Sequence, residues 1–563
     1  RFSVAVEAVR RNPGDERTGR AVQMIAKVSQ ATDPLATLAE SLAQAKGQLA
    51  ALEAALAALP AGTVAGKDLQ SAAATLRAEV SATETRRASL GSCRIEVGGT
   101  ALTPADYAIV TPDQPTAPER YAARDLRYHL ELITGQVFPI VSESERGAAA
   151  GLFVGNTRKA AAAGVNCAEL GLEGIHLKSV GPSLVLAGNQ RGCLYAVYGF
   201  LEDSLNCRWF TPDCATWPRA GTLRVADLDR RFIPPLEFRA GDYPVAKPGE
   251  FAVRCRLNGN NHQMTVEQGG RKGVHSLAHT FAALCPPERY FAQHPEYFSQ
   301  VGGKRQSGYA QLCLTNPEVL KIVTAGVRQW IRQMPDMKVF SVSQNDTDMH
   351  CECDNCTRVA EEEGSQMGPV LRFVNAVADD IRADYPDVAI ETLAYQYTRK
   401  PPRVTRPRPN VIVCLCSIEC CFVHPLGTDE FNRTFADDIR GWNRICQRLW
   451  IWDYVINYAH SICPFPNLNV LRPNIEFFLA NGVKGIYEES CYYTKGSELQ
   501  ELRNYIIAKT LWDQQYDTNK AIDEFCAAYY GPAAPSVRAY LDLIDRSVQA
   551  QSKVHVQIYT HPR

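Results

Sequence analysis

One stretch of the sequence, residues 341–356, brings together side chains that could act as acids, contact a sugar or hold a metal. In its first part, an apolar stretch that includes Val342 leads into Gln344, the amide Asn345 and the carboxylate Asp346. Its second part has the spacing His-Cys-x-Cys-x-x-Cys, formed by His350, Cys351, Cys353 and Cys356. The stretch could therefore form a metal site, a disulfide-bonded loop or the rim of an active site in which Asp346 reacts. The choice depends on the elements that position it.

The chain from Pro234 to about residue 500 repeats a strand followed by a helix, with helices expected at 317–333, 369–385 and 471–481. Several strand segments are almost continuously apolar, as is typical of parallel strands buried on both faces. Eight such units predict a (β/α)8 TIM barrel over residues 230–500. No glycine-rich phosphate-binding turn follows a strand, which argues against a doubly wound nucleotide-binding sheet. The eight predicted strands are residues 236–241, 253–260, 274–279, 338–346, 389–397, 410–419, 447–454 and 484–490.

Three further regions flank the predicted barrel. Residues 1–90 are rich in Ala and Leu at helical spacing, interrupted at Pro60, and predict a helical hairpin with one apolar face. Residues 93–229 alternate short strands with helices and predict a small α/β accessory domain. Residues 501–563 predict a C-terminal helical extension. The predicted fold class is therefore α/β.

The composition excludes some partners. The 563 residues include 60 basic and 61 acidic side chains, so the formal net charge of -1 indicates neither nucleic acid nor an anionic membrane. No apolar run approaches the ~20 residues that span a bilayer, so no membrane span is predicted. The chain begins at Arg1 without a signal-like segment, as expected of a processed or trimmed product. The 19 cysteines are an odd number, and most are expected to be small buried side chains.

In a TIM barrel, catalytic groups lie where the strands end, on the C-terminal face. The ends of the predicted strands carry carboxylates, amides, tyrosines and tryptophans. Acids and amides hydrogen-bond sugar hydroxyls and aromatic rings stack on sugar rings, so this set favours a carbohydrate substrate. The predicted substrate-binding residues are Arg239, Asn258, His275, His279, Asn345, Tyr397, Trp452, Tyr454 and Glu489.

Four carboxylates at these strand ends are candidates for the catalytic pair, namely Asp346, Glu419, Asp453 and Glu488. Each has an alternative structural role, because an Asp at a strand end often caps the next helix and a Glu can pair with a base such as Arg239. We predict that at least two of the four act in catalysis. His275 and His279 are equally compatible with substrate contacts and with core positions.

The cysteine cluster falls in the loop after the fourth predicted strand, on the catalytic face. His350, Cys351, Cys353 and Cys356 supply up to four ligands, the number that a structural zinc ion requires. Ligands this close in sequence rarely close a tetrahedron alone, and Cys420 or Cys421 could complete a zinc site or a disulfide. A loop held by a disulfide or a structural zinc ion is ranked first and a free-thiol cluster second. A catalytic metal ranks last, and no cofactor is predicted to be required.

Longer motifs extend over these elements. They include SVSQND with the C-x-C-x-x-C that follows, GPVLRFVNAVADDI, ETLAYQYTRKPP, CSIEC, WIWDYVINY, PFPNLNVLRPNI, YEES and FCAAYYGPAA. Over about residues 230–545 the chain resembles the DUF4838 family of bacterial carbohydrate-active proteins. That family includes glycoside hydrolase family 163, endo-β-N-acetylglucosaminidases that cut complex N-glycans. Residues 93–229, with Arg191-Gly192 and RWFTP at 208–212, resemble the accessory domain of α-glucuronidases and hexosaminidases.

The resemblance implies an extracytoplasmic glycosidase that cleaves a β-N-acetylglucosaminide bond by substrate-assisted retention, in which the 2-acetamido oxygen attacks the anomeric carbon. One carboxylate, Asp346 or Asp453, would orient the amide. The acid would be Glu419 or Glu488, and whichever residue serves should be held protonated near neutrality. Tyr397 and Tyr454 would hydrogen-bond the amide or the ring.

Two alternatives remain open from the sequence. The first is an α-glucuronidase-like exo-glycosidase, in which Arg239 and Arg254 would bind a substrate carboxylate. The second is a non-catalytic glycan-binding protein, for which carboxylate-to-amide changes would weaken neither binding nor stability much.

Overall fold

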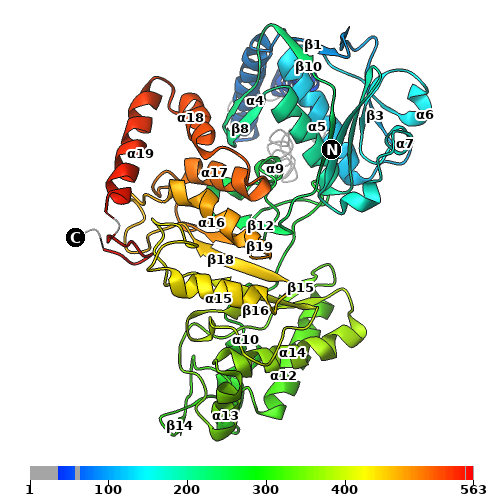
Figure 1. Cartoon of the computed structure of the whole chain (residues 1–563). Coiled ribbons are helices and arrows are strands. Elements are labelled where there is room, and N and C mark those ends of the chain that lie inside the picture. Colours follow the sequence, from blue (N-terminus) through cyan, green and yellow to red (C-terminus); the bar gives the residue numbers. More distant parts are fainter. Residues whose placement is uncertain (1–35, 58–63, 552, 562–563) are drawn as a thin grey trace. The chain divides into compact units, whose positions relative to one another are not determined.

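The chain forms two compact units in the computed structural model (Figure 1). The structure describes residues 36–57, 64–551 and 553–561. The first unit runs to Arg208 and includes two later segments, Thr216–Ile233 and Val266–Gly269, and the second unit contains the remainder. No helix in the described part of the chain is both long and apolar enough to cross a bilayer.

The first unit begins with the predicted helical hairpin, formed by α3 (Leu38–Ala57) and α4 (Val64–Ala88). The two helices pack through an apolar cluster that includes Leu52 and Leu69. Glu131 of the next helix accepts hydrogen bonds from the first backbone N–H groups of α3, which otherwise have no partner within the helix. The part of the predicted hairpin before residue 36 lies outside the described residues.

The larger sheet of the first unit has six strands, is mixed, and packs with helices. The strand order is β11–β6–β7–β5–β3–β4. The bounds are β11 Asp229–Phe232, β6 Ile175–Val180, β7 Ser183–Gly188, β5 Gly151–Val154, β3 Ala108–Thr111 and β4 Ile140–Ser142. The helices are α5 Ala117–Thr134, α6 Glu143–Arg146, α7 Arg158–Ala162 and α8 Arg191–Gly199, and a small sheet contains β10 Thr222–Val225, β1 Arg94–Val97 and β2 Thr100–Ala101.

The second unit is built on a six-stranded parallel sheet in the order β12–β19–β18–β17–β16–β15. The bounds are β12 Phe238–Gly241, β19 Val483–Glu489, β18 Leu449–Tyr454, β17 Val411–Cys416, β16 Ala389–Ala394 and β15 Val339–Ser341. These strands match six of the eight predicted ones. Their apolar runs are buried on both faces, as in β17, where all six residues are buried.

The other two predicted strands, 253–260 and 274–279, do not form. Residues Gly249–Arg254 form the helix α9, in which Glu250 and Arg254 pair at 2.9 Å with helical i,i+4 spacing. Segment 274–279 contributes one isolated bridge, between His275 and Phe340 of β15.

A few backbone hydrogen bonds nevertheless connect the two edges of the parallel sheet through these loops. The Asn258 N–H donates to the Arg239 carbonyl of β12 at 3.0 Å, and the Lys272 N–H donates to the Asn258 carbonyl at 2.7 Å. At the other edge, the His275 N–H donates to the Val339 carbonyl of β15 at 2.9 Å. Since one loop region reaches both edge strands, the sheet is curled into a partial barrel rather than the predicted barrel of eight strands.

Helices cover the outside of this curled sheet. α14 packs against β16 and β17, α16 packs against β19, and α17 packs against β12. The helix bounds are α10 Phe281–Leu284, α11 Pro287–Tyr290, α12 Pro317–Gln333, α13 Asp354–Glu363, α14 Met367–Asp384, α15 Arg433–Asn443, α16 Leu468–Ala480, α17 Gln500–Trp512, α18 Thr518–Tyr529 and α19 Ala534–Gln549. A short hairpin of β13 Gln300–Val301 and β14 Lys304–Arg305 precedes α12.

Candidate active site

The pleat of the sheet decides which strand-end residues face the interior of the partial barrel. β18 and β19 pair so that Asp453 lies beside Glu488 and Tyr454 lies beside Glu489. Tyr487 belongs to the apolar core enclosed by the curled sheet. Because alternate residues of a strand share a face, Glu489 and Tyr454 lie on the inner face with Tyr487. Asp453 and Glu488 lie on the outer face.

Glu489 is half-buried at the end of β19 and has two aromatic hydrogen-bond donors. The Trp452 indole N–H donates to Oε2 at 2.5 Å, and the Tyr458 hydroxyl donates to Oε1. Burial raises the pKa of Glu489 to about 7, although these two hydrogen bonds act to lower it. The charges of Asp242 and Asp346 add to the increase. A carboxyl with this pKa can hold a proton at neutral pH and release it, as a general acid requires.

Asp346 lies at the end of the segment that follows β15 and is exposed. The Tyr395 hydroxyl donates to its Oδ1 at 3.1 Å, and its backbone N–H donates to the Tyr309 hydroxyl at 3.3 Å. Its charge acts on Glu489, so the two carboxyl groups lie within electrostatic reach of each other. The site thus has one half-buried carboxyl and one exposed carboxylate.

Asn345 is not exposed as Asp346 is, because its side chain is buried and already hydrogen-bonded. Its Nδ2 donates to the Ala310 carbonyl at 2.6 Å, and its Oδ1 accepts from the Ala282 N–H at 3.0 Å. The Asn345 N–H donates to Gln311 Oε1 at 2.9 Å, and Gln311 Nε2 donates to the Asn345 carbonyl at 2.8 Å. The structure therefore uses Asn345 to position the backbone that carries Asp346.

Several aromatic residues complete this face. The His279 ring lies 5.9 Å from the Tyr395 ring, and its Nδ1 is 2.9 Å from the Gln344 carbonyl. Tyr454 is buried, and burial raises the pKa of its hydroxyl. Tyr559, 66% exposed, stacks obliquely with Tyr458 at 5.8 Å.

Tyr559 belongs to a C-terminal segment that the site-residue prediction did not include. The Tyr458 N–H donates to the Ile558 carbonyl and the Phe422 N–H donates to the Val556 carbonyl, so the segment is bound to the loops after β17 and β18. Burial raises the pKa of Tyr559, and the charges of Asp346 and Glu489 contribute to the increase. Tyr559 therefore lies within electrostatic range of both carboxyl groups. Nothing in the local sequence around Tyr559 signals this.

Asp242, at the end of β12, is a third carboxyl on the inner face. The Tyr487 hydroxyl donates to its Oδ2 at 2.7 Å, and the Ser490 N–H donates to its Oδ1 at 2.7 Å. Burial raises its pKa, and these hydrogen bonds oppose the increase. Its oxygens are occupied by donors from the β19 end, so Asp242 supports the strand that carries Glu489.

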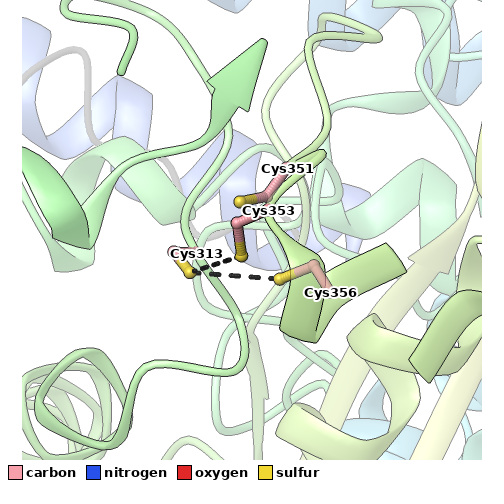
Figure 2. A group of neighbouring side chains, drawn as sticks. All are labelled: Cys313, Cys351, Cys353 and Cys356. Carbon is pink, nitrogen blue, oxygen red and sulfur yellow. Dashed lines mark hydrogen bonds between the residues drawn. The ribbon is translucent and has the colours of Figure 1, made fainter. Parts of the chain in front are cut away.

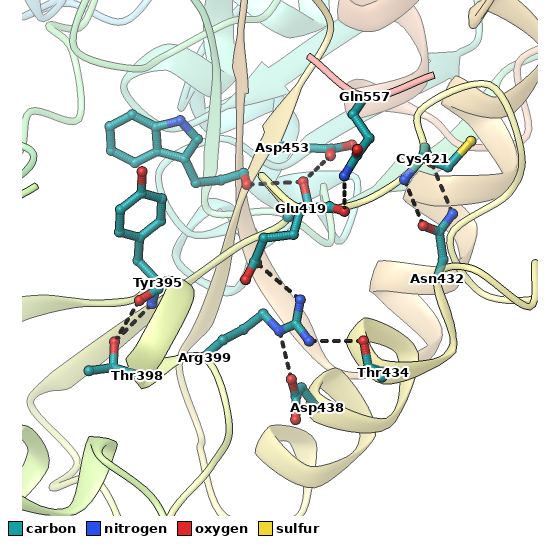
Figure 3. Close-up of polar contacts among 12 residues, drawn as sticks. Tyr395, Thr398, Arg399, Glu419, Cys421, Asn432, Thr434, Asp438, Asp453 and Gln557 are labelled. Atoms are coloured by element: carbon teal, nitrogen blue, oxygen red, sulfur yellow. Dashed lines mark hydrogen bonds and ion pairs between the residues drawn. The ribbon is translucent and has the colours of Figure 1, made fainter. Parts of the chain in front are cut away.

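Asp453 and Glu488 form a separate buried pair on the outer face. Both are at most 2% exposed, and the Ser417 hydroxyl donates to Asp453 Oδ1 (Asp453 is labelled in Figure 3). Burial raises the pKa of Asp453 to about 6. Burial and the charge of Asp453 raise the pKa of Glu488 well above its usual range. These two candidates lie away from the inner face.

Glu419 is exposed and ion-paired. Figure 3 shows Arg399 between the carboxylates of Glu419 and Asp438. The Arg399 guanidinium is 3.0 Å from the Glu419 carboxylate and 2.7 Å from the Asp438 carboxylate. The backbone carbonyl of Glu419 accepts a hydrogen bond from Gln557 of the C-terminal segment at 2.8 Å. The ion pair with Arg399 accounts for the position of Glu419 without a role in proton transfer.

Four other predicted substrate-binding residues are placed elsewhere. Arg239 is fully buried, with its guanidinium 5.5 Å from the Trp512 ring of α17 and its Nε bonded to the Arg256 carbonyl. Asn258 bonds its side chain to the backbone of residues 237 and 239. The His275 ring packs on Trp330 of α12 at 4.7 Å. Tyr397 stacks on His350 at 5.3 Å.

The predicted cysteine cluster has a different fourth member. Cys351, Cys353 and Cys356 gather with Cys313, whereas His350 stacks on Tyr397. Cys421 instead neighbours His424 and His555, and so does not complete the first cluster. No disulfide joins any of the 19 cysteines in the structure, and all except Cys214, Cys353 and Cys463 are buried.

Comparison with known proteins gives one family match. The sequence profile of a family described as "Domain of unknown function (DUF4838)" matches residues 209–542. No curated protein matches the chain.

Several solved structures resemble the chain at low identity. One is described as a GH138 enzyme targeting pectin rhamnogalacturonan II, with a TM-score of 0.39 and 10% identity over 80% of this chain and 69% of that one. Another is a family 89 enzyme from Clostridium perfringens, described as in complex with its substrate GlcNAc-alpha-1,4-galactose, with a TM-score of 0.40 and 9% identity over 69% of this chain and 49% of that one. A family 89 glycoside hydrolase from the same organism, in complex with 2-acetamido-1,2-dideoxynojirmycin, has a TM-score of 0.40 and 10% identity over 64% and 47% of the two chains. The chain thus spans about half the length of the last two structures.

Proposed function

The chain belongs to the DUF4838 family, and on that premise we propose that it is a glycoside hydrolase whose general acid is Glu489. The observation that carries the proposal is the environment of this carboxyl. It lies on the inner face at a strand end, its pKa is raised to about 7, and Trp452 and Tyr458 fix its two oxygens. A protonated carboxyl in this position can donate to a leaving glycosidic oxygen.

The second catalytic group of the proposal is Asp346. It is exposed, and the Tyr395 hydroxyl orients its carboxylate. The reaction we propose is cleavage of a β-N-acetylglucosaminide bond within a complex glycan. In it, the Asp346 carboxylate accepts a hydrogen bond from the N–H of the substrate's 2-acetamido group. The amide oxygen then attacks the anomeric carbon as the leaving oxygen takes the proton of Glu489. Water later opens the oxazolinium intermediate, and Glu489 takes the proton of that water.

The substrate class in this proposal follows the family resemblance of the sequence motifs. A glycan bound at the site would contact His279 and the exposed rings of Tyr309 and Tyr559, which can hydrogen-bond or stack on sugars. Because complex N-glycans are displayed outside cells, the proposal places the enzyme's action outside the cytoplasm. No cofactor takes part.

The uronic-acid alternative needs a basic clamp at the site. Arg239 and Arg254 were the candidates, and neither lies on the inner face. Arg239 is buried against Trp512, and Arg254 pairs with Glu250 and lies 5.9 Å from the Trp209 ring. These two residues therefore do not supply the basic clamp that the uronic-acid alternative requires.

The neighbouring carboxyls Glu488 and Glu489 of β19 provide a matched pair of variants to test which residue is the acid. The full chain is incubated with a fluorescently labelled biantennary complex N-glycan, alongside Glu489→Gln, Asp346→Asn and Glu488→Gln variants. We expect release of glycan with one N-acetylglucosamine left behind, a loss of kcat of about 10²–10⁴-fold in Glu489→Gln, and much of the rate retained in Glu488→Gln. A wild-type chain that binds the glycan without cleaving it would support the glycan-binding alternative. Loss in Glu488→Gln with retention in Glu489→Gln, in folded variants, would reverse the assignment of the acid.

A further inference from the structure

Four cysteine side chains from two separate parts of the second unit meet beside the segment that carries Asp346. Cys313 precedes α12, Cys351 and Cys353 lie in the loop after β15, and Cys356 lies in the first turn of α13. Their Sγ atoms all lie within 4.8 Å of one another. Figure 2 shows the sulfurs of Cys313, Cys353 and Cys356 directed toward one another.

The sulfur–sulfur distances distinguish the chemistries open to such a cluster. Cys313 Sγ is 3.7 Å from Cys353 Sγ and 3.9 Å from Cys356 Sγ. A tetrahedron with Zn–S bonds of about 2.3 Å has edges of about 3.8 Å, whereas a disulfide bond is about 2.0 Å long. The observed distances therefore match the edges of a zinc tetrathiolate.

Polar groups around the sulfurs suit the negative charge of such a centre. The Gln300 N–H and the Arg305 guanidinium approach Cys351 Sγ at 3.4 Å and 3.6 Å. The Thr315 hydroxyl lies 3.2 Å from Cys356 Sγ. A zinc ion with four thiolates carries a net charge of -2, and donors to the sulfurs stabilise that charge and orient the ligands.

We propose that Cys313, Cys351, Cys353 and Cys356 bind one zinc ion in a structural tetrathiolate site. The protein supplies all four ligands, so no position remains for water and the ion has no catalytic part. The site ties the start of α13 to the segment before α12 and holds the loop that begins at Asp346. Zinc binding itself does not depend on the proposed glycosidase activity, so either proposal can fail without the other.

The test uses the full chain, purified under reducing conditions and passed over a weak chelating resin. Zinc per chain is measured by mass spectrometry for the wild type, for Cys353→Ser and for Cys463→Ser. Both substituted residues are half-buried cysteines, and Cys463 lies outside the cluster. We expect one equivalent of zinc to be lost in Cys353→Ser and none in Cys463→Ser. Equal zinc contents in the two variants would overturn the proposal.

A second measurement applies to the wild type and so does not depend on a variant that folds. X-ray absorption at the zinc edge should give only sulfur neighbours at about 2.3 Å, and cobalt substitution should give the intense visible absorption of a tetrahedral thiolate complex. Nitrogen neighbours would instead point to the group of Cys421, His424 and His555 and would contradict the proposal. So would a chain without zinc in which a disulfide joins two of the four cysteines.

Discussion

Replacing Tyr458 with Phe removes one of the two hydrogen bonds that favour the ionised form of Glu489. The hydroxyl donates to Oε1, and this bond lowers the pKa of a carboxyl that burial and neighbouring charges raise to about 7. Hydrogen bonds to charged groups contribute about 1.5–3 kcal/mol, and one pKa unit corresponds to about 1.4 kcal/mol. Since Glu489 is half-buried, water replaces part of the lost bond, so we expect its pKa to rise by about one unit.

The direction of the effect follows from the role of the acid. A general acid must be protonated in the reacting complex, so the rate falls as the pH rises through its pKa. In Tyr458→Phe the basic limb of the profile of kcat/KM against pH should therefore move about one unit toward higher pH, with little change at about pH 6. The assay uses a chromogenic β-N-acetylglucosaminide, with Tyr540→Phe as control because Tyr540 is 41% exposed on α19. A basic limb that stays in place, or moves to lower pH, would refute the assignment of Glu489. Carboxyl ¹³C NMR, with Glu489→Gln to identify the signal, measures the same pKa without turnover.

Three further predictions concern the supporting residues. Asn345→Ala removes hydrogen bonds with Ala310 and Ala282, so the free energy of unfolding, measured by urea denaturation, should fall by about 1–3 kcal/mol. The kcat should also fall, because Asp346 loses its position. An unchanged free energy of unfolding would contradict this role of Asn345. Tyr559→Ala should change the free energy of unfolding by no more than about 0.5 kcal/mol, because the ring is exposed. Its KM should rise several-fold, whereas Tyr559→Phe should retain part of the substrate binding. Equal KM values in the wild type and both variants would show that Tyr559 is not part of the site. The pKa values of Asp453 and Glu488 are raised, so the folded state binds protons at these groups more tightly than the unfolded state does. The contribution of this pair to the free energy of unfolding is therefore complete below about pH 4 and is lost as the pH rises through the pKa values of the folded state. Chemical denaturation from about pH 4 to about pH 7 should show this loss for the wild type and a smaller loss for Glu488→Gln, and parallel profiles would exclude the pair as its source.

The sequence by itself determined the class of elements and much of their order. Long apolar runs such as Val411–Cys416 bury both faces and form parallel strands, and the regular helical spacing of residues 317–333 forms α12 as expected. The sequence also showed polar residues near the strand ends, because Asp346 comes shortly after the apolar residues of β15 and Glu489 is the last residue of β19. In contrast, the strand predicted over residues 253–260 was wrong, because the segment forms the end of α9 and a loop, and local propensity for a strand depends on packing partners that the sequence does not show.

Only the tertiary structure decided which of these residues share a site. Adjacent residues of a strand point to opposite faces, so the register of β19 against β18 separates Glu489 on the inner face from Glu488 on the outer one. No local pattern contains that register. Cys313 joins the three later cysteines of the cluster only because two loops fold together. Tyr559 comes within electrostatic range of the carboxyls only because the C-terminal segment binds to the loops after β17 and β18. Chemical type and periodicity are local properties of a chain, whereas a site is formed by contacts between segments that lie far apart in the sequence.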